Sequence, residues 1–146
     1  MRLLYLITRA EPGGAQVHLL ELLRGFRDRA ELHLGVGEDQ DGFLVEEARA
    51  LGVRVHLLRH LVQPVRPVKD FRGLFEVMAL LRKVRPHLLH AHSSKAGFLG
   101  RLAGRALGVK SVFTAHGWAF TDGVPEGMKR LALSMERLAG RLGDLV

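Results

Sequence analysis

The chain has 146 residues, of which 47% are hydrophobic and 25% charged, a balance typical of one soluble globular domain with its own core. It contains no cysteine, which excludes disulfides and thiolate metal sites, and no apolar run near the roughly 20 residues that a membrane-spanning helix needs. The net charge is +7, but the basic residues are scattered and lack interleaved aromatic residues, so we expect no nucleic-acid partner.

The first half of the chain alternates short apolar runs with amphipathic segments. In chain order, we expect a strand over 2–8, a helix over 15–27, a strand over 31–36, a helix over 43–50 and a strand over 53–58. Glu11-Pro12-Gly13-Gly14 predicts the turn from the first strand into the first helix. Leu51-Gly52 is typical of a helix C-terminus and separates the second helix from the third strand.

The second half continues the alternation after a basic loop marked by prolines. In chain order, we expect this loop over 59–68, a helix over 70–85, a strand over 88–91, a helix over 95–107, a strand over 110–115 and a last helix from Pro125 or Glu126 to Leu142. The helix over 95–107 contains Gly97, Gly100 and Gly104, which favour close packing of this helix on the sheet. Asp144-Leu145-Val146 predicts the opening of a sixth strand.

The alternation of strands and helices determines the predicted fold. Strands separated by helices indicate a parallel sheet with right-handed crossovers, and strands that are apolar throughout indicate helices on both faces. We therefore predict an α/β, Rossmann-like three-layer sandwich with a parallel sheet of order 3-2-1-4-5 and a truncated sixth strand. Residues 1–146 form a single domain in this interpretation.

Two strand ends carry residues suited to ligand binding. Gly13 and Gly14 separate a strand from a helix start, where backbone N–H groups and the helix dipole favour a phosphate. The alternative is a plain strand-to-helix turn. The fifth strand runs into His116-Gly117-Trp118. Because the ends of such strands open onto one crevice, we expect the glycine turn and His116 to face the same site.

Four segments, in order, carry a resemblance to a known family. They are PGGAQ at 12–16, RPVKD at 66–70, HAHSSKAG at 90–97 and FTAHGW at 113–118. Together they resemble the N-terminal domain of a family-four (group 1) retaining glycosyltransferase of the two-Rossmann-domain, GT-B type. The bacterial enzymes of exopolysaccharide and lipopolysaccharide assembly are the most similar, and the likeness extends over essentially the whole chain.

The resemblance implies a function. It implies the acceptor-binding half of an enzyme that moves a hexosyl unit from a nucleotide-diphosphate sugar to a saccharide or lipid-linked acceptor. In this family a C-terminal domain with paired glutamates holds the donor. That domain is absent from these residues, so we expect the isolated chain to be inactive, and we expect no cofactor and no metal. The alternative is a stand-alone Rossmann-like module that binds a nucleotide or sugar phosphate.

His116 is the candidate catalytic residue. The resemblance makes it the active-site histidine on the acceptor side of the cleft. An imidazole can donate a hydrogen bond to a sugar hydroxyl or stabilise charge near the reacting carbon. Retaining transfer is described as front-face attack assisted by the donor phosphate, so His116 need not be a general base. The alternative is a histidine that only ends a strand.

Two further histidines flank the end of the fourth strand. We expect His90 and His92 to point to opposite faces of the sheet, with His92 toward the crevice and His90 packed in the interior. On this expectation His90, His92 and His116 do not form a zinc site, and neither a carboxylate nor a cysteine is near them in sequence to complete one.

The remaining candidates bind donor phosphate or acceptor in this interpretation. They are Gly13, Gly14, His92, Ser93, Ser94, Lys95 and Gly117, with Arg66 and Trp118 as acceptor contacts. Lys95 opposes the dipole at a helix start, which favours a role in binding an anion. The serines are equally suited to cap that helix, Arg66 to a solvated basic loop and Trp118 to packing.

The last helix is basic and amphipathic. Its apolar side carries Leu131 and Leu138 among others, while Arg130, Arg137 and Arg141 lie elsewhere on it. Such helices lie on anionic membranes, although a helix that covers a sheet gives the same pattern. We expect a cytoplasmic protein with peripheral contact at the inner membrane face.

Overall fold

The computed structural model describes residues 1–9, 13–38, 42–62, 66–116 and 125–144. In chain order the elements are β1 (Arg2–Arg9), α1 (Gly14–Phe26), β2 (Glu31–Glu38), α2 (Phe43–Ala50), β3 (Arg54–Leu57), α3 (Pro67–Val84), β4 (Leu88–Ala91), α4 (Ser94–Leu107), β5 (Lys110–Phe113) and α5 (Glu126–Gly140). The five strands are parallel and lie in the predicted order, β3-β2-β1-β4-β5. Within the described ranges, no helix has both the length and the apolar character needed to cross a bilayer.

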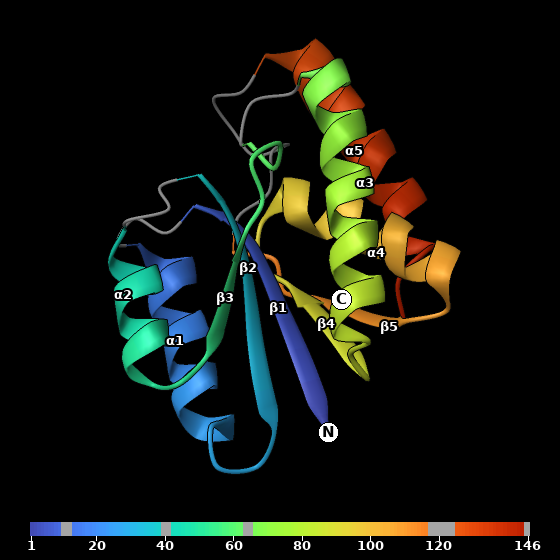
Figure 1. Ribbon diagram of the computed structural model, residues 1–146. Coiled ribbons are helices and arrows are strands. Elements are labelled where there is room, and N and C mark those ends of the chain that lie inside the picture. Colours follow the sequence, from blue (N-terminus) through green and yellow to red (C-terminus); the bar gives the residue numbers. More distant parts are fainter. Residues whose placement is uncertain (10–12, 39–41, 63–65, 117–124, 145–146) are drawn as a thin grey trace.

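Strand β1 lies at the centre of the sheet and contributes to a separate core on each face. Leu3, Tyr5 and Ile7 pack with α1 and α2, whereas Leu4 and Leu6 pack with α3 and α4, because successive side chains of a strand point to opposite faces. Figure 1 shows the resulting layers, with α1 and α2 on one side of the sheet and α3, α4 and α5 on the other. The predicted Rossmann-like three-layer sandwich is confirmed.

Helix α4 packs closely on the sheet, as its small residues predict. A Cβ atom on Gly97 would lie 2.6 Å from the ring of Phe113, and one on Gly100 would lie 3.2 Å from a side-chain carbon of Leu89. The buried Arg101 then joins α4 to α5. Its guanidinium donates to the Glu136 carboxylate at 2.9 Å, and its Cζ lies 4.4 Å from the ring centroid of Phe113.

Helix α3 begins three residues earlier than predicted, at Pro67. Proline suits the first helical position because its missing N–H would have no partner inside the helix. The N-cap residue, Arg66, is extended, and its backbone N–H donates to the Asp70 carboxylate at 3.1 Å. Asp70 therefore lies inside the first turn, where it satisfies a backbone donor at the helix start.

The far edge of the sheet also differs slightly from prediction. Strand β5 ends at Phe113, two residues early, because its partner β4 ends at Ala91, the residue paired with Phe113. Asp144 lies beside β5, since its N–H donates to the Ser111 carbonyl at 3.0 Å and its carboxylate accepts from the Ser111 N–H at 2.8 Å. Residues 145–146, the rest of the expected sixth strand, lie outside the described residues, so that strand stays a prediction.

Candidate functional site

A cavity of about 320 Å³ opens where β1 and β4 end, at the point where the strand order reverses. Open α/β sheets bind ligands at this position. The described residues that line the cavity come from the end of β1, the first turn of α1, and the segments that follow β4 and β5: Ile7, Thr8, Arg9, Ala15, Gln16, His92, Ser93, Ser94 and His116. None of these lining residues is acidic.

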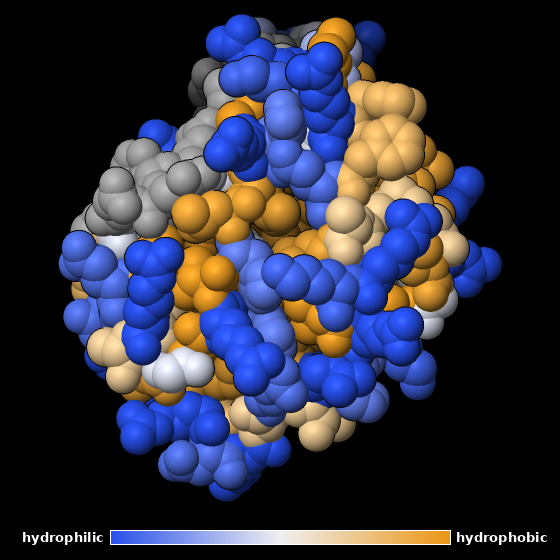
Figure 2. Space-filling view, in the orientation of Figure 1, coloured by the Kyte–Doolittle hydropathy of each residue, from blue (hydrophilic) through white to orange (hydrophobic). Residues whose placement is uncertain are grey.

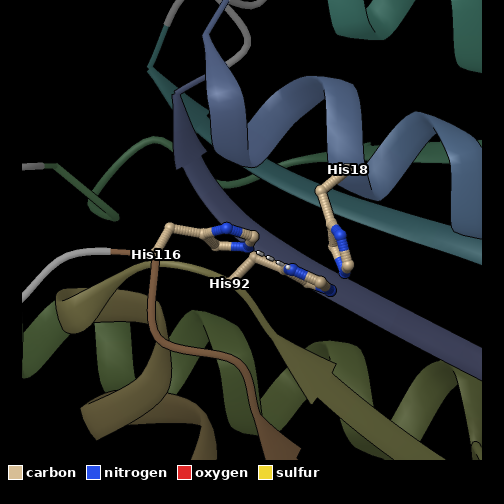
Figure 3. A group of neighbouring side chains, drawn as sticks. All are labelled: His18, His92 and His116. Atoms are coloured by element: carbon tan, nitrogen blue, oxygen red, sulfur yellow. Dashed lines mark hydrogen bonds between the residues drawn. The ribbon is translucent and has the colours of Figure 1, made fainter.

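Two imidazoles that line this cavity, those of His92 and His116, lie next to a third, that of His18 (Figure 3). His92 follows β4, His116 follows β5, and His18 reaches in from α1. His92 Nδ1 lies 3.1 Å from His116 Nε2, a hydrogen bond whose donor depends on the tautomer. The ring centroid of His18 lies 5.1 Å from that of His116 and 5.8 Å from that of His92. The three rings therefore form a compact triangle drawn from three separate elements.

The site holds at least two of these imidazoles in their neutral form. Burial, followed by the charges of His90, His116 and His18, lowers the pKa of His92 to about 2. Burial, followed by the charge of His18, also lowers the pKa of His116. At neutral pH these rings therefore offer a lone pair and an N–H rather than a positive charge.

His18 joins the cluster in the structure, although no sequence motif singled it out. The available signal was its position, one turn after Gly14 and Ala15, where a helix side chain can still face the crevice at the helix N-terminus. His18 is exposed and interrupts the apolar residues Val17 and Leu19. The pattern of an amphipathic helix gives no reason to distinguish this histidine from any other exposed polar residue.

The expectation that His90 and His92 point to opposite faces is wrong. Their ring centroids lie 4.1 Å apart, because residues two apart in a strand share a face. His90 is half-buried and lies next to His92. Its Nε2 lies 2.7 Å from Thr114 Oγ1. Burial, then the charges of His18 and His116, lowers the pKa of His90 to about 4. The ring of Tyr5 lies against both histidines, with centroids 5.5 and 5.9 Å away.

Ser93 and Ser94 connect the cavity to the start of α4. Ser93 is the N-cap of this helix, and its Oγ accepts from the N–H of Ala96 at 3.4 Å. The same Oγ also accepts from the backbone N–H and the hydroxyl of Thr8, at 3.3 and 3.1 Å. Ser93 thus fixes the N-terminus of α4 against the end of β1, and Ser94 lines the cavity beside it.

The glycine turn lies at the N-terminus of α1. Gly13 is the N-cap in an extended conformation, with φ −178°, and Gly14 is the first helical residue. Neither has the positive φ that would require glycine for conformational reasons. A Cβ atom on Gly14 would meet nothing within 4 Å, so the space beside this backbone is open. Ala15 and Gln16, rather than the two glycines, line the cavity.

The other candidates are spread more widely. The Lys95 amine pairs with the Asp70 carboxylate between α4 and α3, and both groups are largely buried, so this lysine does not line the cavity. Arg66 is exposed at the N-cap of α3 and is also not among the lining residues. Gly117 and Trp118 lie outside the described residues.

Comparisons of sequence identify similar proteins. A family model for a glycosyl transferase 4-like domain matches residues 13–146. The chain is 31% identical over 137 residues to the Escherichia coli UDP-Gal:alpha-D-GlcNAc-diphosphoundecaprenol alpha-1,3-galactosyltransferase, a match that covers 87% of this chain and 35% of that protein. It is 26% identical to the E. coli O-antigen biosynthesis glycosyltransferase WbnH, over 79% of this chain and 32% of that protein. The chain thus spans about a third of the length of these relatives.

Comparisons of structure give the same fold. HepE of Anabaena, solved in complex with UDP and glucose, superposes on the whole chain with a TM-score of 0.74 at 22% identity. MurG of Acinetobacter baumannii superposes on 99% of the chain with a TM-score of 0.69 at 13% identity. The chain covers 37% and 40% of those two structures. Both matches support the Rossmann-like fold of this chain.

Proposed function

The chain belongs to the glycosyl transferase 4-like family, and on that premise we propose that it is the acceptor-side domain of a nucleotide-sugar-dependent hexosyltransferase. Its acceptor is a saccharide or a lipid-linked saccharide. The observation that carries the proposal is the cavity at the reversal of strand order, with His116 on its wall. A fold alone does not determine function, so the proposal depends on this site. Open α/β sheets bind ligands at the reversal of strand order, which is where the cavity lies.

The cavity combines the groups that a sugar and a phosphate require. The N-termini of α1 and α4 both border it, through Ala15 and Gln16 of α1 and Ser93 and Ser94 at the start of α4. Helix N-termini favour anions through free N–H groups and the helix dipole. The neutral imidazole of His116 supplies a donor or an acceptor for a sugar hydroxyl. These features support Ser93, Ser94 and the turn at Gly13 and Gly14 as contacts of the donor phosphate or the acceptor.

The proposed chemistry is transfer with retention of configuration. The bond between the anomeric carbon and the donor phosphate breaks, and the acceptor oxygen bonds to that carbon from the same face. The proton of the acceptor hydroxyl passes to the departing diphosphate, so the reaction does not need His116 as a general base. His116 instead donates a hydrogen bond to a sugar hydroxyl or stabilises the charge that develops near the reacting carbon. We propose that the reaction uses no metal and no cofactor besides the donor substrate.

The partners of the chain follow from this proposal. A second domain would hold the nucleotide sugar across a cleft, which is consistent with relatives about three times as long. The E. coli relative at 31% identity is named for UDP-galactose and a diphosphoundecaprenol-linked acceptor. UDP-sugars and polyprenyl-diphosphate saccharides are therefore the substrates to assay first, with a cytoplasmic location as part of the same proposal.

We also propose contact with an anionic membrane surface, which a lipid-linked acceptor would require. The outer face of α3 exposes Val68, Phe71 and Phe75, and the basic residues Lys69 and Arg72 lie between and beside them. Figure 2 shows pale orange and orange apolar groups next to blue hydrophilic ones in its upper right, in the region of α3. Exposed aromatic rings flanked by cations match the interface of a bilayer with anionic lipids.

His116→Ala in the complete transferase tests the proposed function. We expect turnover to fall at least about 100-fold, the cost of removing one hydrogen-bonding group at a reacting centre. His87→Ala is the matched control, because His87 is exposed, precedes β4 and so lies at the opposite end of that strand from the cavity, which it does not line. Unchanged turnover in His116→Ala, with folding intact by circular dichroism, would remove His116 from the site.

A further inference from the structure

The three imidazoles at the cavity are arranged as ligands of a metal ion. Each of His18, His92 and His116 offers one ring nitrogen, and these three atoms lie within 4.8 Å of one another. The ring centroids form a triangle with sides of 5.1, 5.4 and 5.8 Å. Zn²⁺ bound at about 2.0–2.1 Å by tetrahedrally arranged imidazoles places the ring centroids roughly 5 Å apart. The observed triangle is close to that size.

The closest pair within the cluster already has ligand spacing. His92 Nδ1 and His116 Nε2 are 3.1 Å apart, and two nitrogens of a tetrahedral zinc site lie roughly 3.3 Å apart at the same bond length. His18 supplies the third ligand from an exposed position on α1.

The chemistry of the cluster favours a metal over an anion. Imidazole nitrogens are preferred ligands of divalent transition metals, and three of them come together here from separate elements. His92 is 1% exposed, and its Nε2 has no hydrogen-bond partner among the described residues. The ring nitrogen of His92 that would bind the ion is therefore Nδ1, the atom beside His116, and the ring proton then lies on Nε2.

We propose that His18, His92 and His116 bind a divalent transition-metal ion such as Zn²⁺. Three histidines leave one position of a tetrahedral ion for water or another ligand, and two of the three, His92 and His116, line the cavity. Imidazole ligands select Zn²⁺, Cu²⁺ or Ni²⁺ over the oxygen-seeking Mg²⁺ and Ca²⁺. A bound ion occupies a nitrogen of His116. The proposed transferase function requires a free His116 imidazole. If that function holds, bound Zn²⁺ inhibits sugar transfer.

Calorimetric titration of this chain with Zn²⁺ near neutral pH, in the absence of any sugar, tests the site. We expect one ion to bind per chain. His18→Ala and His116→Ala should each weaken binding at least about tenfold. His87→Ala should bind as the wild type does, and Mg²⁺ should not bind. Both informative variants change exposed side chains, so circular dichroism is expected to show an unchanged fold.

Two outcomes would overturn the metal site. One is the absence of saturable Zn²⁺ binding, and the other is binding that survives both His18→Ala and His116→Ala. Neither outcome affects the transferase proposal, which depends on turnover of the complete enzyme. Conversely, unchanged turnover in His116→Ala would remove His116 from the proposed transferase site, and the calorimetric titration of the chain would still decide whether the metal site exists.

Discussion

His92 illustrates how position determines the chemistry of a single residue. Its backbone N–H donates to the Leu6 carbonyl of β1 at 2.9 Å, which holds its backbone beside the end of β1, and its side chain lines the cavity. The ring then lies among Tyr5, His90, His18 and His116, and it is 1% exposed. Burial in these surroundings opposes a positive charge on the ring. The lowered pKa of His92 therefore has a consequence for stability as well as for ligand binding.

We predict that the free energy of unfolding decreases as the pH falls below the ordinary histidine pKa of about 6.5. The unfolded chain takes up a proton on His92 there, whereas the folded chain does not until about pH 2. The unfolded state thus binds more protons, and His92 alone accounts for a loss of about 1.4 kcal/mol per pH unit. Urea unfolding of wild type and His92→Gln with a chelator, from pH 7 to about 5, measures the difference in slope.

His92→Gln removes the titrating group and keeps a polar side chain. The slope of unfolding free energy against pH should therefore be smaller in this variant than in the wild type, by about 1.4 kcal/mol per pH unit. The comparison of slopes is independent of any constant loss of stability in the variant. Equal slopes would mean that His92 is protonated in the folded state, which would contradict both its burial and its neutral form in the site.

At the scale of elements, the glycines of α4 and α1 have opposite roles. Gly97 faces the sheet, where Phe113 leaves no room for a methyl group. Gly25 lies near the end of α1 on an exposed surface, where a Cβ atom would meet nothing within 4 Å. The same substitution should therefore change stability in opposite directions at the two positions.

We predict that Gly97→Ala lowers the free energy of unfolding by about 1–3 kcal/mol, because the added methyl group overpacks the contact with Phe113. Gly25→Ala should raise it by up to about 1 kcal/mol, because alanine loses less backbone entropy in a helix. Thermal or urea unfolding of the two variants provides the measurement. A stabilising Gly97→Ala would show that α4 does not pack against β5 as closely as described.

At the scale of the whole molecule, the side of the sheet covered by α3 presents exposed aromatic rings to solvent. The side that carries α3 exposes Phe71 at 63% and Phe75 at 54%. Their rings contact each other edge to face, with centroids 5.0 Å apart. Nearby acidic groups on α3 are already paired, Asp70 with Lys95 and Glu76 with His60. Lys69 and Arg72 are exposed on the same helix, so basic groups flank the two rings.

We predict that the chain sediments with vesicles containing anionic lipid and not with purely zwitterionic vesicles. Replacing both Phe71 and Phe75 with Ser should remove most of this binding, because the rings supply the buried apolar area. Replacing both Leu131 and Leu138 with Ser in α5 is the matched comparison. If only the α5 variant loses binding, the membrane surface is the basic last helix, and if neither does, the chain makes no membrane contact through these faces.

Most of the architecture was predictable from the sequence because it depends on local patterns. Apolar runs, glycine and proline signals and the right-handed crossover rule together predicted five strands and their order. The errors lie at boundaries, such as the start of α3, where the Arg66–Asp70 cap decides the first residue. The end of β5 is another, because the length of its partner β4 sets it.

The site was predictable only in part. The sequence by itself determined that His92, Ser93, Ser94 and His116 follow neighbouring strands, and parallel strands bring such residues to one edge of the sheet. Only the tertiary structure decided that His18 joins them and that Lys95 turns away to Asp70. The physical reason is that strand order follows from local patterning and short connections, whereas the direction of a side chain on a helix depends on how that helix packs against distant parts of the chain.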